Sequence, residues 1–379
     1  MKSVMIIGAT GVFGRRLAAH LAQFEGVSLI LTSRDEAKAQ ALAASLSPNA
    51  KGIALERSAK LAEQLAKHRP WAVIDCSGPF QTADYSVPLA TLKAGAHYVD
   101  LADASGFLSG ALLETAELAR NAGVVAAFGA STTPGLSSAV VAELARNMQR
   151  VESIDIAVTP GGQGEVGDAV IKAVLSYAGR PVPVWRDGKL QHAVGWSGGA
   201  FLNIEGLGKR RVALVETYDA ELLGPRYEVR DYVRFRAGLE ARIEQRGLET
   251  FSWIRRHGFN FNTEQLVRPL SFIRQIMRRL TSDKGAMFVE VKGKDATGLS
   301  MSKRWTLLAR KGDGPNVPIM AAAAVIKRLL QENTEPGAYL AGDLVGLRAI
   351  EKQMLGYHIR CGQNHRSMHR QDQKLHKAA

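Results

Sequence analysis

Three glycines near the start of the chain are spaced for phosphate binding. Gly8, Gly11 and Gly14 follow a short apolar run and precede residues that repeat at helical spacing. Glycines at such a junction let the backbone turn tightly and approach a pyrophosphate, whose charge faces the amides of the helix N-terminus. The spacing G-x-x-G-x-x-G is one residue longer at its start than the usual motif. The segment Gly8–Gly14 therefore predicts a dinucleotide site, and the alternative is a glycine-rich turn that binds no ligand.

Arg34 indicates which dinucleotide to expect. It lies twenty positions after Gly14, where an NAD enzyme places an acidic residue on the ribose 2′-hydroxyl. An arginine preceded by Ser33 instead suits a 2′-phosphate, through charge-assisted hydrogen bonds. The adjacent Asp35 is better suited to cap the next helix. We therefore expect NADP rather than NAD, and the alternative for Arg34 is a solvated surface arginine.

The run Ser77–Phe80 predicts a rigid turn beside the nicotinamide. Pro79 fixes a backbone dihedral, Gly78 allows close approach, and Phe80 could pack on a ring. The alternative is a strand-to-helix turn with no ligand contact. Cys76, just before this run, is expected to be a small buried residue rather than a nucleophile. The predicted cofactor contacts are Gly8, Thr10, Gly11, Val12, Phe13, Gly14, Ser33, Arg34, Ser77, Gly78, Pro79 and Phe80.

One tyrosine and two aspartates are the candidates for catalysis. Tyr98 and Asp100 are two apart on an expected strand, so they share a face, and Asp103 follows in the same loop. A carboxylate there could orient a substrate amine or raise a neighbour's pKa for acid–base work. Capping of the following helix is an equally open interpretation of the aspartates. Because hydride transfer is the cofactor's chemistry, the protein mainly has to position and polarise the substrate.

An alternation of strands and helices must position these residues. The expected strands are Val4–Ile7, Val27–Leu31, Gly52–Leu55, Ala72–Asp75, Ala96–Leu101 and Val124–Phe128. The expected helices are Val12–Gln23, a helix that follows Asp35, Ala59–Lys67, Tyr85–Ala94 and Ser109–Asn121. Such an alternation predicts a parallel, doubly wound sheet, which binds ligands at the carboxyl ends of its strands. The loops that carry the candidate residues should therefore meet at one edge.

The pattern changes after Val151, where several expected strands follow with few helices between them. Asp187–Gly188 lies between two strand-like runs and gives a good hairpin signal. This half predicts a mostly antiparallel sheet, with one face on helices and the other available to a second subunit. A glycine loop at 161–167 precedes the expected helix Asp168–Tyr177. It could bind an anionic substrate group, and the alternative is a flexible connection.

Composition limits the class of protein. A chain of 379 residues suggests two domains, and it contains no run of eighteen apolar residues and no signal-peptide pattern. Two cysteines, Cys76 and Cys361, give no basis for a disulfide framework, so we expect a cytoplasmic protein. The net charge of +13 suits nucleic acid, anionic lipid or a polyanionic cofactor. No nucleic-acid-binding module is recognisable, so we expect no nucleic-acid partner.

Residues 251–280 alternate large apolar side chains with arginines. A basic amphipathic helix can lie on an anionic membrane surface. We favour a helix packed on its own protein, with peripheral membrane contact as the alternative. Pro269 is expected to break the segment, which leaves Leu270–Leu280 as the longest helix.

The end of the chain, residues 356–379, is expected to be a basic tail without regular structure. His365 and His369 have the i, i+4 spacing that could share a metal ion, but no acidic or cysteine ligand accompanies them. We therefore expect no metal site.

Several of these segments together resemble the saccharopine dehydrogenase-like (saccharopine reductase-type) family of NADP-binding oxidoreductases. The matching signatures are GATGVFG at 8–14, IDCSGPF at 74–80, AGAHYVDLAD at 94–103, GASTTPGLSSAVV at 129–141 and GDGPNVPIMAAAAVIKRLL at 312–330. The resemblance implies a Rossmann domain, residues 1–148 plus 315–355, interrupted by an inserted α+β domain, residues 149–314. That second domain would carry the substrate and homodimer contacts. NADP-linked chemistry at a carbon–nitrogen bond is also implied.

The expected fold is therefore α/β, with an N-terminal Rossmann sheet and an inserted domain built on a mostly antiparallel sheet. The leading functional hypothesis is an NADP(H)-dependent oxidoreductase that transfers hydride at a C–N or C=O centre of a small amine- or carboxylate-bearing substrate. One alternative is a non-catalytic NADP(H)-binding redox sensor or scaffold. Another is a membrane-associated reductase of a lipid-like substrate, which the basic amphipathic stretch suggests.

Overall fold

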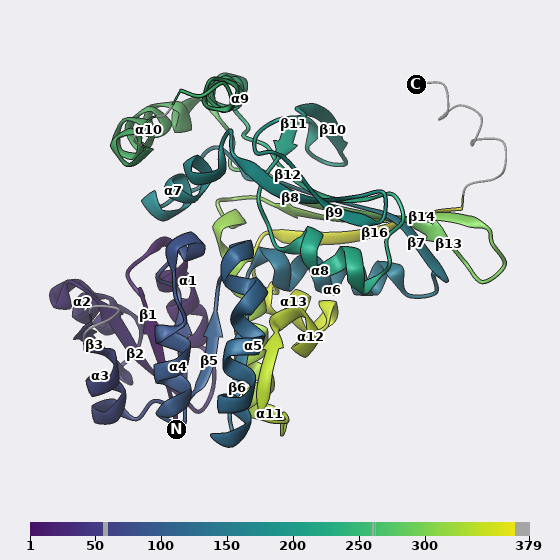
Figure 1. Ribbon diagram of the computed structural model, residues 1–379. Coiled ribbons are helices and arrows are strands. Elements are labelled where there is room, and N and C mark those ends of the chain that lie inside the picture. Colours follow the sequence, from purple (N-terminus) through teal and green to yellow (C-terminus); the bar gives the residue numbers. More distant parts are fainter. Residues whose placement is uncertain (56–59, 260, 262, 368–379) are drawn as a thin grey trace. The chain divides into compact units, whose positions relative to one another are not determined.

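The chain folds into two compact units, each with its own sheet. The structure, a computed structural model, describes residues 1–55, 60–259, 261 and 263–367 (Figure 1). Unit 1 contains Met1–Leu136, Glu165–Ala169 and Pro315–Met354. Unit 2 contains Ser137–Gly164, Val170–Gly314 and the chain from Leu355 onward. Two apolar cores at this chain length agree with the size at which a single core stops growing.

Unit 1 is built on a parallel sheet of seven strands in the order β15-β6-β5-β4-β1-β2-β3. The strands are β1 (Lys2–Ile7), β2 (Val27–Ser33), β3 (Ala50–Ala54), β4 (Ala72–Asp75), β5 (His97–Asp100), β6 (Val125–Phe128) and β15 (Gly337–Leu340). The central strands are near-continuous apolar runs, such as Val4–Ile7, because both faces of a parallel sheet are buried. The order turns back at β1, whose neighbours are β2 and β4, and such a reversal is where open parallel sheets bind ligands.

Helices cover both faces of this sheet, as the predicted doubly wound fold requires. The helices of unit 1 are α1 (Val12–Leu21), α2 (Glu36–Leu46), α3 (Leu61–His68), α4 (Ser86–Lys93), α5 (Ser105–Asn121), α11 (Met320–Gln331), α12 (Ala341–Leu344) and α13 (Leu347–Gln353). Helix α1 contacts α2 and α11, while α4 contacts α3 and α5, so the helices form two layers. Two short 3₁₀ helices, η1 (Phe80–Thr82) and η4 (Gly314–Ile319), and the π-helix η2 (Thr132–Leu136) complete the helical elements.

Unit 2 is built on a nine-stranded, mostly antiparallel sheet, as the sequence predicts. Its main order is β10-β11-β12-β7-β13-β14-β16, and β8 joins β12 and β9. Its strands are β7 (Arg150–Thr159), β8 (Pro181–Arg186), β9 (Lys189–Val194), β10 (Ala200–Ile204), β11 (Gly208–Leu214), β12 (Tyr232–Ala237), β13 (Gly285–Lys294), β14 (Ser300–Ala309) and β16 (Ile359–Ser367). The pair β12–β7 is parallel. The turn Asp187–Gly188 joins β8 to β9 with positive φ at both residues, which confirms the predicted hairpin.

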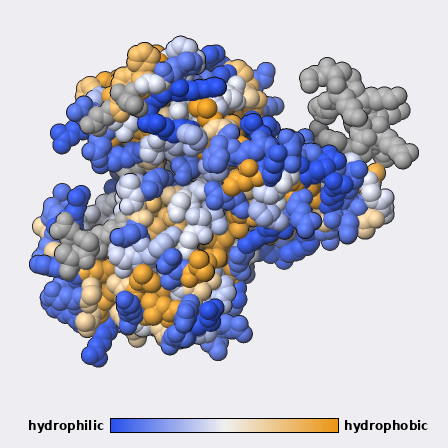
Figure 2. Space-filling view, in the orientation of Figure 1, coloured by the Kyte–Doolittle hydropathy of each residue, from blue (hydrophilic) through white to orange (hydrophobic). Residues whose placement is uncertain are grey.

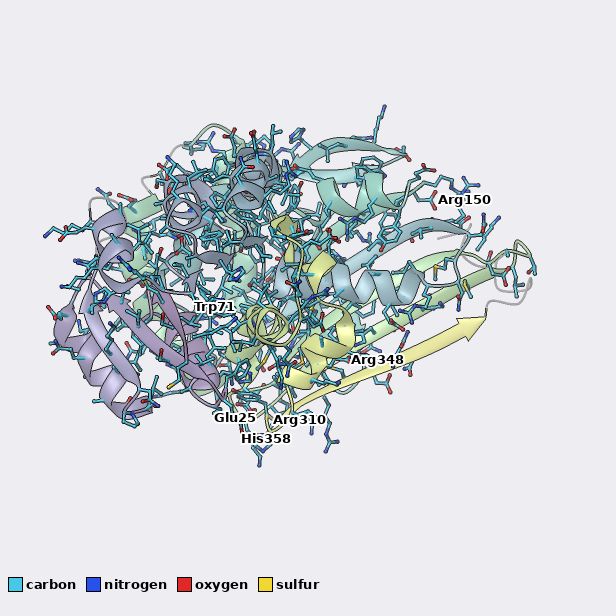
Figure 3. The ribbon with its side chains drawn as sticks, turned by 90° about the horizontal axis from the view of Figure 1, so that it is seen from below. Glu25, Trp71, Arg150, Arg310, Arg348 and His358 are labelled. Atoms are coloured by element: carbon cyan, nitrogen blue, oxygen red, sulfur yellow. The ribbon has the colours of Figure 1, made fainter. Side chains whose placement is uncertain are left out.

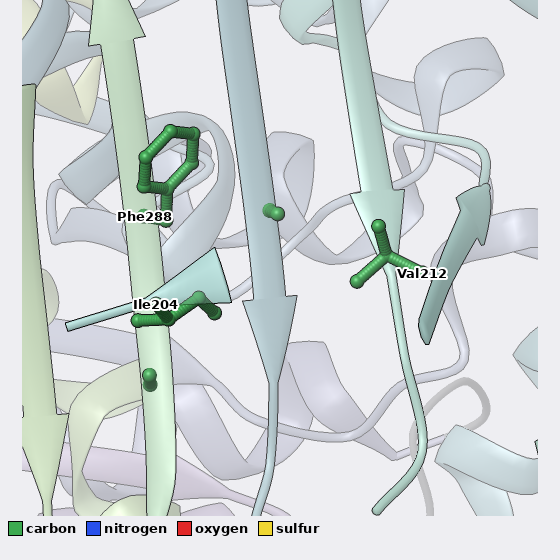
Figure 4. Packing of buried hydrophobic residues seen from close by; sticks show 5 residues of the cluster. Ile204, Val212 and Phe288 are labelled. Carbon is green, nitrogen blue, oxygen red and sulfur yellow. The ribbon is translucent and has the colours of Figure 1, made fainter. Parts of the chain in front are cut away.

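The helices of unit 2 are α6 (Ser137–Ala145), α8 (Asp219–Arg226), α9 (Arg242–Arg256) and α10 (Thr263–Met277). Helix α7 (Asp168–Tyr177) begins in unit 1 and continues in unit 2. Helix α6 packs against β13 and β14, so it lies with unit 2 although the sequence grouped it with the Rossmann domain. Part of the core consists of Phe288, Val212 and Ile204, which meet on one face of the sheet (Figure 4). Burying such side chains contributes roughly 1.5–3 kcal/mol each.

The described part of the predicted tail, residues 356–367, is not the unstructured segment that we expected. Ile359–Ser367 forms β16, which pairs antiparallel with Met301–Ala309 of β14. The strand starts beside the Asp313 carboxylate, which accepts a hydrogen bond from the backbone N–H of His358, and Arg310 donates its N–H to the carbonyl of His358 (Figure 3). Backbone hydrogen bonds at the edge of a sheet do not require apolar side chains. The polar sequence of Ile359–Ser367 therefore has no hydrophobic pattern that would predict a strand. His369 lies outside the described residues.

The prediction that Pro269 ends a helix is also wrong. Pro269 lies inside α10, which runs from Thr263 to Met277 and is followed by the 3₁₀ turn η3 (Arg278–Leu280). A proline in a helix frees the carbonyl four residues earlier, here that of Gln265. Gln265 and Pro269 are both exposed, so water can satisfy that carbonyl. In the described part of the chain, no helix is long and apolar enough to cross a membrane.

Candidate functional site

The glycine turn after β1 has the geometry that a phosphate-binding turn requires. Gly8 has φ of +72°, a conformation that favours glycine. A Cβ on Gly14 would lie 2.2 Å from the carbonyl oxygen of Gly8, so no side chain fits there. Gly11 is the N-cap of α1 and donates its N–H to the Gly8 carbonyl at 3.0 Å. The turn is therefore compact, and it requires glycine at positions 8 and 14.

The N-terminus of α1 is left open by this turn. Gly11 provides no side-chain cap, and the first turn of α1 contains no acidic residue. The first N–H groups of a helix have no intrahelical acceptor and carry a partial positive charge. Gly11 is exposed and Val12 and Phe13 are half-buried, so an anion can reach these amides. The turn and the helix start together fit a pyrophosphate.

The loop after β2 contacts this turn through two hydroxyl groups. The Thr10 hydroxyl donates to the Ser33 Oγ at 3.1 Å, and that Oγ also accepts the N–H of Asp35. Asp35 caps α2 by accepting the N–H of Lys38 at 3.3 Å, as the sequence predicts. The hydrogen bonds and charge of Lys38 also lower the pKa of the Asp35 carboxyl. Since Asp35 is engaged as a cap, the exposed Arg34 is the side chain at this strand end that suits a 2′-phosphate.

The loop after β4 lies directly against the glycine turn. A Cβ on Gly8 would lie 3.1 Å from the Cα of Ser77, so the two backbones touch. Asp75 fixes this loop, because the Asp75 Oδ1 accepts hydrogen bonds from the Ser77 backbone N–H at 2.9 Å and from the Ser77 hydroxyl at 2.5 Å. The peptide bond between Gly78 and Pro79 is cis. Ser77 and Gly78, both half-buried, thus lie next to Gly8 at the carboxyl edge.

Phe80 is less accessible to a ligand than the sequence suggested, whereas Cys76 is as unreactive as expected. Phe80 is 5% exposed and packs on Phe107, with 5.5 Å between ring centroids. Its ring is therefore part of the core of unit 1 and is not presented to the cofactor edge. Burial, and then the charges of Asp75 and Asp100, raises the pKa of the Cys76 thiol well above its usual value. A thiol with a raised pKa is a poor nucleophile, as expected for Cys76.

Asp100 is a buried carboxyl in register with Asp75 on the neighbouring strand. Its Oδ1 accepts the N–H of Gly129 at 2.7 Å and that of Ala102 at 3.1 Å, which ties the ends of β5 and β6 together. Burial raises the pKa of Asp100 to about 7, against the effect of these two N–H groups, and nearby Asp75 raises it further. Asp100 is therefore partly protonated at neutral pH, although it has no exposed surface.

The other two predicted catalytic residues differ sharply in exposure. Tyr98 has no exposed surface and packs on Phe128, with ring centroids 5.4 Å apart. Its hydroxyl lies on the side of Asp100 and lowers that pKa, so the two residues share a face as predicted. Asp103 is exposed in the loop before α5, where the side chain of Gln81 hydrogen-bonds to it. Of the three, Asp103 is the one whose carboxylate can contact a substrate.

The end of the 161–167 loop lies against the start of α1, a position that the sequence did not predict for it. Glu165 forms ion pairs with Arg15 and Arg16 on α1, and a Cβ on Gly167 would lie 3.3 Å from Val12. The segment Glu165–Ala169 thus belongs to unit 1 although unit 2 surrounds it in the sequence. A pairing this far apart in the chain has no local sequence signal.

The glycine loop at 161–167 is not open to an anion at Gly162. The Gly162 N–H donates to Oε2 of Glu240 at 2.8 Å, and that oxygen also accepts the N–H of Ser282. The protein's own carboxylate therefore occupies the position that an anionic substrate group would take. The flexible-connection alternative is also replaced, because Glu240 anchors this loop. Within the described residues, no cluster of three or more His, Cys, Asp or Glu side chains is arranged to hold a metal ion.

Comparison with known proteins identifies the N-terminal domain. Residues 4–127 match the family model of the saccharopine dehydrogenase NADP binding domain. This match covers the glycine turn, Ser33–Arg34, the Ser77–Pro79 loop and Asp100–Asp103. NADP is the cofactor of this domain type, and the turn, the open start of α1 and Arg34 fit it. No curated protein sequence matches the chain.

The fold of the whole chain is that of known dehydrogenases. Apo saccharopine dehydrogenase (L-Glu forming) from Saccharomyces cerevisiae has a TM-score of 0.65 at 15% sequence identity, over 96% of this chain and all of that one. A mutant meso-dapdh from Clostridium tetani E88, solved with DAP, has a TM-score of 0.50 at 14% identity, over 92% of this chain and 96% of that one. The resemblance expected from the sequence is thereby confirmed.

Proposed function

We propose that this chain, whose residues 4–127 form a saccharopine dehydrogenase-like NADP-binding domain, is an NADP(H)-dependent oxidoreductase. Its reaction is hydride transfer at a C–N or C=O centre of a small substrate that carries an amine or a carboxylate. The observation that carries the proposal is the edge where the Gly8–Gly14 turn touches the Ser77 loop, with Arg34 exposed beside it. This edge offers separate places for a pyrophosphate, a 2′-phosphate and a nicotinamide.

Different residues of the chain would bind different parts of the cofactor. The start of α1, with the amides of Val12 and Phe13, would bind the pyrophosphate. Arg34 and Ser33 would bind the 2′-phosphate, a charge-assisted contact that NADH cannot make. Ser77 and Gly78 would lie beside the nicotinamide, which supplies the hydride-transfer chemistry when bound.

Asp103 is the proposed substrate-positioning group. Asp103 is an exposed residue at the same edge; burial raises the pKa of its carboxyl, and a hydrogen bond from the Gln81 side chain opposes that shift. An ionised carboxylate there would bind a substrate ammonium group and fix its orientation toward the nicotinamide position. Asp100 would act behind it, since it orders the loop through the N–H of Ala102 and holds a proton near neutral pH.

The proposed substrate class comes from fold-level analogy and from charge. The yeast protein of similar fold is named for saccharopine, and the clostridial one was solved with DAP. A net charge of +13 also favours anionic ligands, including a carboxylate and the cofactor. A homodimer and a cytoplasmic location remain predictions that rest on the resemblance and on the cysteine count.

A non-catalytic NADP(H)-binding protein is the second candidate. The observation that favours it is the complete burial of Tyr98 and Asp100, which leaves Asp103 as the accessible group among the three. Such a protein would bind NADPH through the same turn and turn over no substrate.

One experiment tests the proposal and separates the two candidates. Thermal unfolding is measured with NADPH, and then with NADPH and a panel of amino acids and keto acids, because a bound ligand raises Tm. Panel members that raise Tm further are incubated with NADPH deuterated at the nicotinamide C4. Stereospecific transfer of deuterium into a product supports the oxidoreductase. Stabilisation by NADPH with no transfer to any panel member supports the sensor, and no response to NADPH contradicts both.

A further inference from the structure

Helix α10 presents its apolar side to the outside of unit 2. Phe272, Ile273 and Ile276 are 64%, 49% and 54% exposed, and Leu280 in the following turn is 77% exposed. With Pro269 they follow the spacing i, i+3, i+4, i+7 and i+11, which places them on one side of a helix. We call these five residues the α10 stripe: Pro269, Phe272, Ile273, Ile276 and Leu280.

The opposite side of α10 is the one that attaches it to the unit. Val267 is the buried residue of this helix. Arg274 turns inward, where it pairs with Glu244 of α9 at 3.8 Å, and burial lowers its pKa. A surface helix of a globular protein normally buries its apolar side and exposes its charges. In α10 this arrangement is inverted, so the stripe has no role in holding unit 2 together.

Two arginines, Arg268 and Arg279, border the stripe on one flank. From Val267 to Leu280 the sequence contains four arginines and no acidic residue. Three of them, Arg268, Arg278 and Arg279, are exposed, and within the described residues they form no ion pair. Figure 2 shows the result, with hydrophobic and hydrophilic residues side by side over α9 and α10 at the upper left.

We propose that the α10 stripe docks unit 2 onto an anionic lipid bilayer, with the apolar side chains at the acyl boundary and the arginines on the headgroups. Exposed apolar side chains gain from leaving water, and guanidinium groups reach anionic phosphates through flexible stems. Helix α10 lies along such a surface and does not cross it. This inference is independent of the proposed oxidoreductase function.

Charge decides between a bilayer and a second copy of this chain as the occupant. In a two-fold dimer the same surface meets itself, so Arg268 and Arg279 of one copy would face the same arginines of the other. Like charges brought together at an interface oppose association. An anionic bilayer instead complements every exposed charge that borders the stripe.

The test is co-sedimentation of the full chain with vesicles of phosphatidylcholine alone and of phosphatidylcholine with phosphatidylserine. We expect binding to the anionic vesicles, and a decrease of at least about tenfold in the partition coefficient for the F272D/I276D double variant, since both substitutions place a charge at the acyl boundary. Leu113→Asp is the matched control, because Leu113 is 86% exposed on α5 of unit 1. All substituted side chains are exposed, so an unchanged Tm for each variant verifies that the fold is intact.

Three results would overturn the proposal. They are no binding of the wild-type chain to anionic vesicles, equal binding to both vesicle types, and equal binding by F272D/I276D and the wild type. Light scattering after size-exclusion chromatography adds a fourth. If the wild type is a dimer and F272D/I276D is a monomer, then the stripe is the interface between two copies.

Discussion

Asp75 and Asp100 lie in register on β4 and β5, both fully buried, with their carboxyl groups at the carboxyl edge of the parallel sheet. Each carboxyl organises a different loop. Asp75 holds Ser77, and Asp100 holds Ala102 and Gly129. Burial, and then the charge of the neighbouring Asp75, disfavours the ionisation of Asp100 and raises its pKa to about 7. The loops of the candidate site thus depend on two buried aspartates, of which Asp100 holds its proton near neutral pH.

This arrangement predicts that Asp100→Asn changes how stability depends on pH. The folded-state pKa of Asp100 is raised to about 7, whereas a carboxyl in the unfolded chain has a pKa of about 3.9. The protonated Asp100 carboxyl therefore contributes to the free energy of unfolding. This contribution is fully present below about pH 4 and is lost as pH rises through about 7. The introduced asparagine side chain does not ionise, and its amide oxygen can still accept both N–H groups. We expect the free energy of unfolding of D100N, relative to that of the wild type, to increase by up to a few kcal/mol between about pH 4 and pH 8.

The measurement is the free energy of urea unfolding at a series of pH values. Asp75→Asn is the control, since removal of the Asp75 charge should shift the titration of Asp100 to lower pH. If the difference between D100N and the wild type were independent of pH, the assigned ionisation of Asp100 would be wrong.

A second prediction concerns the tight glycine turn. Gly14→Ala places a Cβ 2.2 Å from the Gly8 carbonyl oxygen, so the turn has to open. We expect NADPH affinity to fall by at least about tenfold and stability to fall by about 2 kcal/mol or more. Gly106→Ala on α5 is the matched control, because its Cβ would meet no atom within 4 Å, and alanine stabilises helices by up to about 1 kcal/mol. Calorimetric titration with NADPH and chemical unfolding measure both effects, and equal NADPH affinity for the two variants contradicts the account.

A third prediction separates substrate positioning from cofactor binding. Asp103→Asn removes the charge of the exposed carboxylate but keeps its shape. We expect NADPH affinity within about twofold of the wild type and a loss of kcat/KM of roughly 10²-fold or more. Steady-state kinetics would use the panel substrate that accepts deuterium. Glu114→Gln, exposed on α5, is the control for a general charge effect. Unchanged kinetics in D103N would remove Asp103 from the proposed mechanism.

The fold was largely predictable because its signals are local. Apolar runs such as Val4–Ile7, the Asp35 cap and the Asp187–Gly188 turn each depend on a few adjacent residues. The same holds for the glycine turn, where the spacing alone fixes the geometry. Asp103 could be identified as a loop residue for a similar reason, since it follows a recognisable strand.

The features that were missed depend on partners far along the chain. Glu240 accepts a hydrogen bond from the Gly162 N–H, and Glu165 forms an ion pair with Arg15. In both pairs the residues are far apart in the sequence, so no local pattern predicts the contact. Tyr98 and Phe80 have the composition of site residues but are buried by packing on Phe128 and Phe107. Helix α10 tolerates its proline because that part of the helix is exposed to water. The polar strand β16 forms because it pairs with the edge of β14.

The central claim is that Arg34 selects the 2′-phosphate of NADP(H) at the edge formed by the glycine turn. The most direct measurement is the dissociation constant of NADPH and of NADH, by calorimetric titration, for the wild type and for Arg34→Ala. We predict that the wild type binds NADPH more tightly than NADH, and that R34A weakens NADPH by about 10-fold or more while NADH changes little, since a charge-assisted hydrogen bond is worth about 1.5–3 kcal/mol. Equal weakening of both cofactors, or no weakening of NADPH, would contradict the account.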